Sequence, residues 1–148
     1  MRAVLQRVSS ASVTVAGELR GEIGAGLLVL VGVSRTDTGA EARWLAGKVA
    51  GLRVLRDGQR DEASAASIGA PVLVVSQFTL HADLTSGRRP SWQAAAPAAS
   101  AEPLVTAFCT ELRALGLPVA TGEFGATMAV HSVNDGPLTL LVETPARP

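Results

Sequence analysis

The sequence contains very little cysteine and histidine, the side chains that most often hold metals or carry redox chemistry. Cys109 is the only cysteine among 148 residues, so the chain cannot form an internal disulfide. It lies among apolar neighbours in a predicted helix, which indicates a buried and unreactive thiol. The two histidines, His81 and His131, are isolated from each other and from Cys109. We therefore expect no metal site and no cofactor.

The sequence also lacks a net charge and a long apolar run. Thirteen basic side chains balance thirteen acidic ones. Neutrality argues against a protein that coats long nucleic acids by charge alone, although it allows a small RNA footprint. No apolar run approaches the length of a membrane span, and charge comes too early for a secretory leader. With 47% apolar residues, we expect one domain over residues 1–148, soluble and cytoplasmic, with no membrane contact.

Patterns typical of β-strands dominate the rest of the sequence. β-branched residues near the start predict a hairpin that turns at Ala16-Gly17-Glu18, and an apolar run between glycines is typical of a strand buried on both faces. The last two predicted strands are joined around Asn134-Asp135-Gly136-Pro137. The predicted strands are residues 4–8, 12–15, 26–33, 71–75, 127–133 and 138–142.

Two segments predict helices. Thr38-x-x-Glu41 is a capping-box pattern, followed by apolar residues at helical spacing as far as Leu52. Ser100 is expected to cap a second helix that stops at Gly116. Residues 57–70 show neither periodicity and predict a mobile surface loop. The fold class expected is α+β: a mixed, largely antiparallel and curled, barrel-like sheet with two main helices.

The segment Ser76-Gln77-Phe78-Thr79 follows directly after an unbroken apolar strand. A hydroxyl, a side-chain amide and free backbone N–H groups can converge at such a strand end, and N–H groups there suit an oxyanion hole. The alternative is that Ser76 and Thr79 only close the strand by bonding to local backbone. Neither His81 nor His131 has a carboxylate placed in sequence to orient it, so a catalytic triad is not indicated.

Two further features each allow either a purely structural or a functional interpretation. Gly87-Arg88-Arg89-Pro90 is the only compact basic cluster, and it is either a solvated loop or a clamp for phosphate. Gly136-Pro137 is either part of an ordinary turn or a cis peptide bond, which only X-Pro sequences adopt at small cost.

The order and spacing of these motifs over nearly the whole chain resemble the D-aminoacyl-tRNA deacylases. Trp92 and Leu138 stand where that family more often has Phe and Val, and Arg60-Asp61-Glu62-Ala63 departs from the family's usual loop. The matching fragments are Gln6-Arg7-Val8, Gly21-Glu22-Ile23-Gly24, Ser76-Gln77-Phe78-Thr79, Gly87-Arg88-Arg89-Pro90-Ser91-Trp92, Thr121-Gly122 with Phe124-Gly125-Ala126, and Val133-Asn134-Asp135-Gly136-Pro137.

The resemblance implies a hydrolase that removes D-amino acids, and glycine mischarged on tRNA(Ala), from the 3′ end of tRNA. Such proofreading serves translation quality control. The resemblance further implies catalysis by Ser76, Gln77, Phe78 and Thr79 without a cofactor, in a homodimer whose active sites lie at the interface. Gly136 and Pro137 of one subunit would reject L-amino acids in the other through a cis bond.

The resemblance assigns supporting roles to a second group of residues. Arg7 would support the Gly136-Pro137 segment, and Arg88 and Arg89 would contact tRNA phosphates. The residues expected to support or bind the substrate are Arg7, Phe124, Ala126, Met128 and Asn134. Two rival functions stay open at this point. One is a general esterase with a Ser76 or Thr79 nucleophile, and the other is a non-catalytic module that binds RNA ends.

Overall fold

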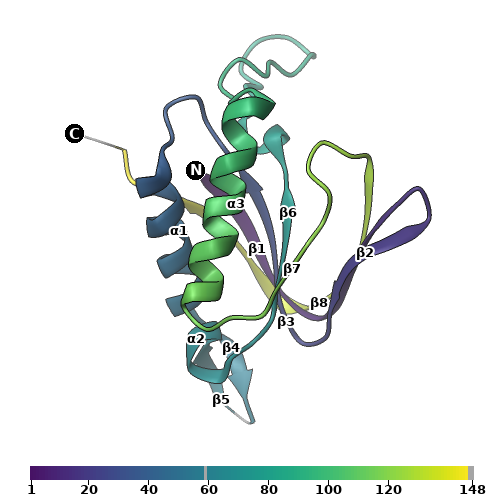
Figure 1. Ribbon diagram of the computed structural model, residues 1–148, viewed down its shortest axis with the longest axis vertical. Helices are drawn as coiled ribbons and strands as arrows, with labels where there is room; N and C mark the ends of the chain where they lie inside the picture. The colour runs from purple at the N-terminus through teal and green to yellow at the C-terminus, as the bar shows by residue number, and fades with distance from the viewer. Residues whose placement is uncertain (59, 147–148) are drawn as a thin grey trace.

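The computed structural model describes residues 1–58 and 60–146, and it shows a mixed sheet with two long helices packed on one face (Figure 1). This arrangement confirms the predicted α+β class with its two main helices. The strands of the sheet are β1 (Arg2–Val15), β2 (Glu18–Ile23), β3 (Gly26–Gly32), β6 (Val72–Ser76), β7 (Val119–Thr121) and β8 (Met128–Glu143). The helices are α1 (Gly39–Gly51), α2 (Ala65–Ile68), the 3-10 helix η1 (Phe78–His81) and α3 (Ala98–Ala114).

The sheet is largely antiparallel around β1 and parallel beyond β3. Its strand order is β2-β1-β3-β6-β7, with β8 paired along the other side of β1. β1 runs antiparallel to β2, β3 and β8, whereas β3–β6 and β6–β7 are parallel pairs. A Cβ on Gly21 of β2 would lie 2.6 Å from the backbone oxygen of Thr121 in β7. Glycine therefore lets β2 approach β7, and the sheet curls into a nearly closed barrel.

Two buried clusters hold β3 and β6 from opposite faces. The larger cluster lies between the sheet and helices α1 and α3, and it contains Phe108, Leu112, Leu45 and Val49. The smaller one lies on the other face. Its members are Val8, Ala11, Val13, Leu28, Leu73 and Val75. Both central strands are thus buried on two sides, as their unbroken apolar sequences predicted, and the end of β6 has a rigid support.

Helix α1 follows its sequence signals closely. Thr38 is the N-cap, and the reciprocal bonds with Glu41 complete the predicted capping box. Its apolar stripe is buried against α3 and the sheet, and the helix ends at Gly51. None of the helices in the described part of the chain is long and apolar enough to cross a lipid bilayer.

The prediction of a mobile loop over residues 57–70 is wrong. β4 (Arg53–Asp57) pairs with β5 (Arg60–Ser64) in a hairpin that turns at Gly58, which has a positive φ. Ser64 then caps α2, and Gly69 ends it in the left-handed region. Three small residues within this polar stretch are buried: Ala63, Ala65 and Ala70. Gln59, which falls within this predicted loop, lies outside the described residues.

Other boundaries also differ from prediction. Residues 4–8 and 12–15, predicted as two strands, belong to one strand, β1. α3 begins at Ala98 after an N-cap at Pro97, so Ser100 lies inside the helix rather than at its cap. The two predicted final strands are one strand, β8, which pairs with β1 from Met128 to Glu143. Asn134-Asp135-Gly136-Pro137 is therefore not a hairpin turn. It lies where the β1–β8 register shifts, and the strand continues through it.

Candidate active site

The Ser76-Gln77-Phe78-Thr79 segment leaves the centre of the sheet at the carboxyl end of β6. Ser76 is the last residue of the strand and lies beside Val31 of β3. The Gln77 N–H donates to the Val31 carbonyl at 2.8 Å, and Phe78 begins the single turn of η1. The first N–H groups of a helical turn have no partner within that turn. The backbone at Phe78 and Thr79 can thus present donors beyond a rigid strand end.

Contacts from the start of β1 fix the far end of η1. The Arg2 guanidinium donates to the Leu80 carbonyl at 2.6 Å and forms an ion pair with Glu143 of β8. η1 also packs directly on Gly32 of β3, because a Cβ there would meet the Gln77 carbonyl oxygen at 2.8 Å. Contacts therefore hold η1 at both of its ends and on the side that packs against β3.

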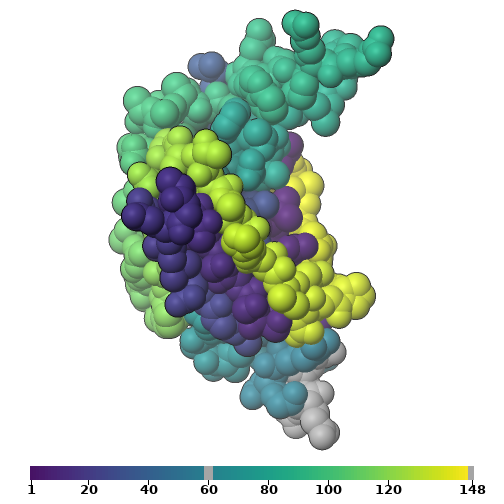
Figure 2. Space-filling view, turned by 90° about the vertical axis from the view of Figure 1, so that its right-hand side faces the viewer, coloured from purple at the N-terminus to yellow at the C-terminus, as the bar shows by residue number. Residues whose placement is uncertain are grey.

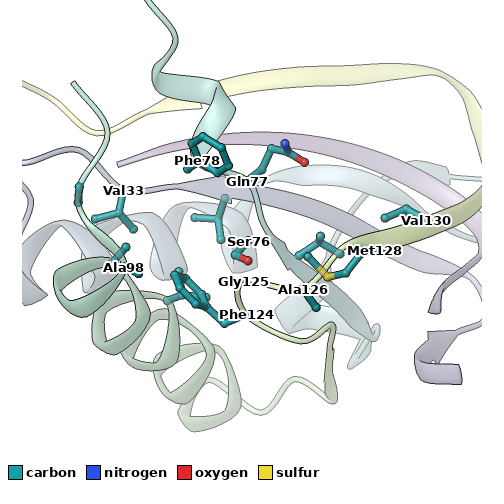
Figure 3. A pocket seen from close by; sticks show the side chains of 15 residues that line it. Val33, Ser76, Gln77, Phe78, Ala98, Phe124, Gly125, Ala126, Met128 and Val130 are labelled. Atoms are coloured by element: carbon teal, nitrogen blue, oxygen red, sulfur yellow. The ribbon is translucent and has the colours of Figure 1, made fainter. Parts of the chain in front are cut away.

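An apolar cavity of about 490 Å³ opens at this turn. Figure 3 shows Ser76, Gln77 and Phe78 on one side of it, with Phe124 from the β7–β8 connection opposite. Of the residues expected in the site, six line the cavity: Ser76, Gln77, Phe78, Phe124, Ala126 and Met128. The structure thus brings together two segments that are almost fifty residues apart in sequence.

Thr79 does not line the cavity. Its hydroxyl oxygen accepts a hydrogen bond from the Gln77 side-chain amide, which closes a small ring across η1. This contact gives Thr79 a local structural partner.

Sequence reasoning missed the other nine residues that line the cavity, among them Val33, Ala98 and Val130. Val33 could have been found, because it ends the same apolar run that pairs with β6. Ala98 and Val130 come from α3 and β8 and depend on tertiary packing.

The Gly136-Pro137 segment forms a second, separate cluster. Its peptide bond is cis, as the family resemblance implied. Arg7 is only 7% exposed and donates to the Asp135 carbonyl at 2.8 Å and to the Val54 carbonyl at 3.1 Å. The Asn134 amide donates to the Arg7 carbonyl at 2.9 Å and to the Leu138 carbonyl at 3.2 Å. These bonds fix the backbone on both sides of Gly136.

Within one chain the two clusters do not meet. None of residues 134–137 lines the cavity, and Gly136 and Pro137 are exposed on the outer edge of the sheet. Asp135 adds an ion pair with Arg56 at 2.5 Å, so this edge segment is charged as well as rigid. A site that used both clusters would need a second copy of the chain.

Arg88 and Arg89 lie in the loop of residues 82–92, which projects from one end of the molecule (Figures 1 and 2). Backbone bonds between Asp83 and Ser91 close the base of this loop at 2.8 and 2.9 Å. Hydrogen bonds from the Thr85 hydroxyl and backbone N–H lower the pKa of the Asp83 carboxyl. Both arginine side chains are exposed.

The remaining titratable candidates lie away from the apolar cavity. Cys109 is buried in α3 as predicted, and burial raises the pKa of its thiol. His131 is exposed on β8. His81 lines a different, polar cavity beside the Met1 amine and Asp37, and burial lowers its pKa. Among the described residues no group of three His, Cys, Asp or Glu side chains is arranged to hold a metal ion.

Comparison with known proteins gives a consistent result. The profile of the D-Tyr-tRNA(Tyr) deacylase family matches residues 4–143. A D-aminoacyl-tRNA deacylase of Acidothermus cellulolyticus is 59% identical over 144 residues, which cover 97% of this chain and 99% of the relative. One of Nocardia farcinica is 59% identical over 147 residues and is covered completely.

Solved structures agree on the fold. One described as a c-Myc DNA unwinding element binding protein superposes with a TM-score of 0.91 at 41% identity, covering 99% of this chain and 100% of the other. Another, described as a probable eukaryotic D-amino acid tRNA deacylase, has a TM-score of 0.83 at 16% identity and covers 95% and 97% of the two chains. At that identity the second likeness shows the fold alone.

Proposed function

The chain belongs to the D-Tyr-tRNA(Tyr) deacylase family, and on this basis we propose that it hydrolyses the ester bond of D-aminoacyl-tRNA in the cytoplasm. Water and the ester give the free D-amino acid and tRNA. The observation that carries the proposal is the position of Ser76, Gln77 and Phe78 at the rim of an apolar cavity, on a turn fixed by β3 and β1. The opposite wall, at Phe124, Ala126 and Met128, would receive the terminal adenosine.

Catalysis would rest on backbone donors rather than on a side-chain base. An aminoacyl ester is already activated, so fixed N–H groups at Phe78 and Thr79 can stabilise the developing oxyanion sufficiently. The ribose 2′-OH beside the ester would help to position the attacking water. The bond from Gln77 to the Thr79 hydroxyl supports a structural role for Thr79 over a nucleophilic one.

Rejection of L-amino acids would come from the partner subunit in a homodimer. The edge strand β8 exposes several large apolar side chains, which a partner surface would cover. These residues are Val130, Val133, Leu140 and Leu141. Gly136 and Pro137 lie on the same strand, so an interface along β8 would carry them to the other subunit. Their carbonyls beside the α-carbon would block an L side chain and admit D-amino acids and glycine, including glycine on tRNA(Ala).

The test is hydrolysis of matched D-tyrosyl-tRNA and L-tyrosyl-tRNA by the purified protein, with and without a metal chelator. We expect chelator-resistant loss of the D-ester alone. The variant Pro137→Ala should admit the L-ester, whereas Pro118→Ala, a control that keeps the carbonyl bonded to Val72 N–H, should not.

Each contrary outcome points to a specific alternative. Equal hydrolysis of both esters by the unmodified protein would indicate an unselective esterase. No hydrolysis by a well-folded dimer would indicate a module that only binds RNA ends. Unchanged selectivity in Pro137→Ala would remove Gly136-Pro137 from the chiral filter.

A further inference from the structure

Two exposed aromatic rings lie together at the mouth of the cavity. Phe78 is 55% exposed and Trp92 is 43% exposed. Their ring centroids are 5.4 Å apart and their planes meet at 68°, an edge-to-face pair. This geometry uses the edge of one ring and one face of the other, and it leaves the remaining faces free for further contacts. Large aromatic side chains are costly to expose, so a pair exposed together calls for an explanation.

The backbone under the pair is well anchored. Phe78 starts η1, which is bonded to β3 and to Arg2. Beyond Trp92, the Arg35 guanidinium donates to the Gln93 carbonyl at 2.5 Å, and the Arg35 N–H donates to the Ala94 carbonyl at 3.2 Å. The two rings therefore project from a rigid base, as a preformed binding surface requires.

Two arginines stand close before Trp92 in the sequence, although the whole chain is neutral. Arg88 and Arg89 are exposed on the loop that leads into Trp92, and neither forms an ion pair with any residue that the structure describes. The carboxylate of Asp83, at the base of the loop, is engaged by Thr85. Guanidinium groups without an ion pair, on a loop that leads into exposed aromatic rings, supply the two kinds of group that bind single-stranded nucleic acid: rings stack on bases and arginines contact phosphates.

We propose that the Phe78–Trp92 pair stacks on the base of the nucleotide that precedes the terminal adenosine of the substrate. Arg88 and Arg89 would contact the phosphates of the same unpaired strand. This inference rests on the proposed function, which places the terminal adenosine in the cavity. Phe78 lines that cavity and also contacts Trp92, so a strand leaving the cavity past Phe78 meets Trp92 next.

The first test compares three substrates that differ only in what precedes the ester: D-tyrosyl-tRNA, the D-tyrosyl ester of the dinucleotide CpA, and the D-tyrosyl ester of adenosine. Stacking of one base corresponds to about 5- to 150-fold in affinity. Trp92→Ala should lower kcat/KM by that range for tRNA and CpA esters and leave the adenosine ester unchanged. Trp92→Phe should retain most of the activity. Trp44→Ala, which removes an exposed tryptophan from α1, is the matched control.

The second test does not depend on catalysis. The chain has two tryptophans, so Trp44→Phe leaves Trp92 as the only indole fluorophore. The trinucleotide CCA should quench its fluorescence, and free adenosine should not. Replacing both Arg88 and Arg89 by alanine should weaken CCA binding and reduce its dependence on salt.

Three results would overturn the proposal. An equal loss on all three esters in Trp92→Ala would show that Trp92 only supports Phe78. Absence of quenching by CCA would show that no base stacks there. Dissociation of the Trp92→Ala variant into monomers in sedimentation would assign the pair to a contact between subunits. If CCA quenches the fluorescence of Trp92 but the protein hydrolyses no ester, the proposed function is wrong and the stacking site is supported.

Discussion

Replacing Gly32 by alanine tests whether the position of η1 sets the activity. Gly32 belongs to β3 and has no left-handed φ, so any penalty for alanine comes from space alone. The new Cβ would lie 2.8 Å from the Gln77 carbonyl oxygen and 3.1 Å from both Leu80 Cβ and His81 Cδ2. Because the closest of these is a backbone atom, no side-chain rotation relieves the clash.

The size of the effect follows from that distance. Ordinary contact begins at 3.4 Å, so the Gln77 carbonyl must retreat by at least about 0.6 Å. A misplacement of about 1 Å can cost about 100-fold in rate when groups must be aligned with the reacting atoms. We therefore expect kcat for D-tyrosyl-tRNA to fall by about 10- to 100-fold. Overpacking of this kind also destabilises a fold by about 1–3 kcal/mol.

The assay is single-turnover hydrolysis of D-tyrosyl-tRNA at a temperature well below unfolding, with thermal unfolding followed by circular dichroism. Gly47→Ala is the matched control, since nothing lies within 4 Å of its Cβ position on α1. That variant should keep full activity and gain about 0.5–1 kcal/mol in stability. Turnover by Gly32→Ala as fast as by the unmodified protein would show that the position of η1 does not set the activity, whether or not the stability of the variant changes.

Three further outcomes are expected. Arg7→Ala should lower the free energy of unfolding in urea by about 1.5–3 kcal/mol, because the buried, charged guanidinium of Arg7 donates hydrogen bonds to two carbonyls. Arg20→Ala, which removes only exposed ion pairs, should cost at most about 1 kcal/mol, and equal losses in the two variants would contradict this prediction. Leu141 is 60% exposed on β8, and Leu141→Asp should shift the sedimenting species from dimer to monomer. Leu19 is 52% exposed on β2, and Leu19→Asp should leave the dimer intact. A dimer that persists in Leu141→Asp would exclude an interface at that position. Burial raises the pKa of the Cys109 thiol and so depletes its thiolate. A disulfide reagent at pH 8 should therefore label Cys109 slowly in the folded protein and rapidly in urea. Fast labelling of the folded protein would show that the thiol is accessible.

The sequence was informative where local pattern and tertiary position agree. The capping box of α1, the turn after β1, and the buried runs of β3 and β6 all follow from spacing and residue type alone. The Ser76-Gln77-Phe78-Thr79 segment was placed correctly at a strand end because the change from apolar to polar residues is abrupt there.

It was misleading where long-range pairing outweighs a local signal. Asn-Asp-Gly-Pro is a strong turn sequence, yet β8 continues through it because pairing with β1 holds both halves. Ser100 is a good capping residue, but Ala98 and Ala99 are good helix formers and extend α3 to Pro97. The hairpin and helix within residues 57–70 depend on burying single alanines, which hydrophobic periodicity cannot detect.

The location of the cavity also needed the fold. Phe124 lies across the cavity from the end of β6 because β7 pairs with β6 and Phe124 follows β7 directly in the chain. No sequence spacing specifies that pairing. Gly136 and Pro137, conversely, were singled out by the family resemblance, which implied that they act in the other subunit; neither residue lines the cavity of its own chain.

The pairing of β1 with β8 has a consequence for how the protein is made. β1 is translated well before residues 128–143, which pair along one of its sides, and Arg2 lies opposite Glu143. A nascent chain on the ribosome therefore carries β1 with one edge unpaired until residues 128–143 have been translated. Contacts so distant in sequence slow folding and expose strand edges to aggregation meanwhile. Synthesis of this protein should accordingly benefit from chaperones that shield the first fifteen residues until β8 emerges.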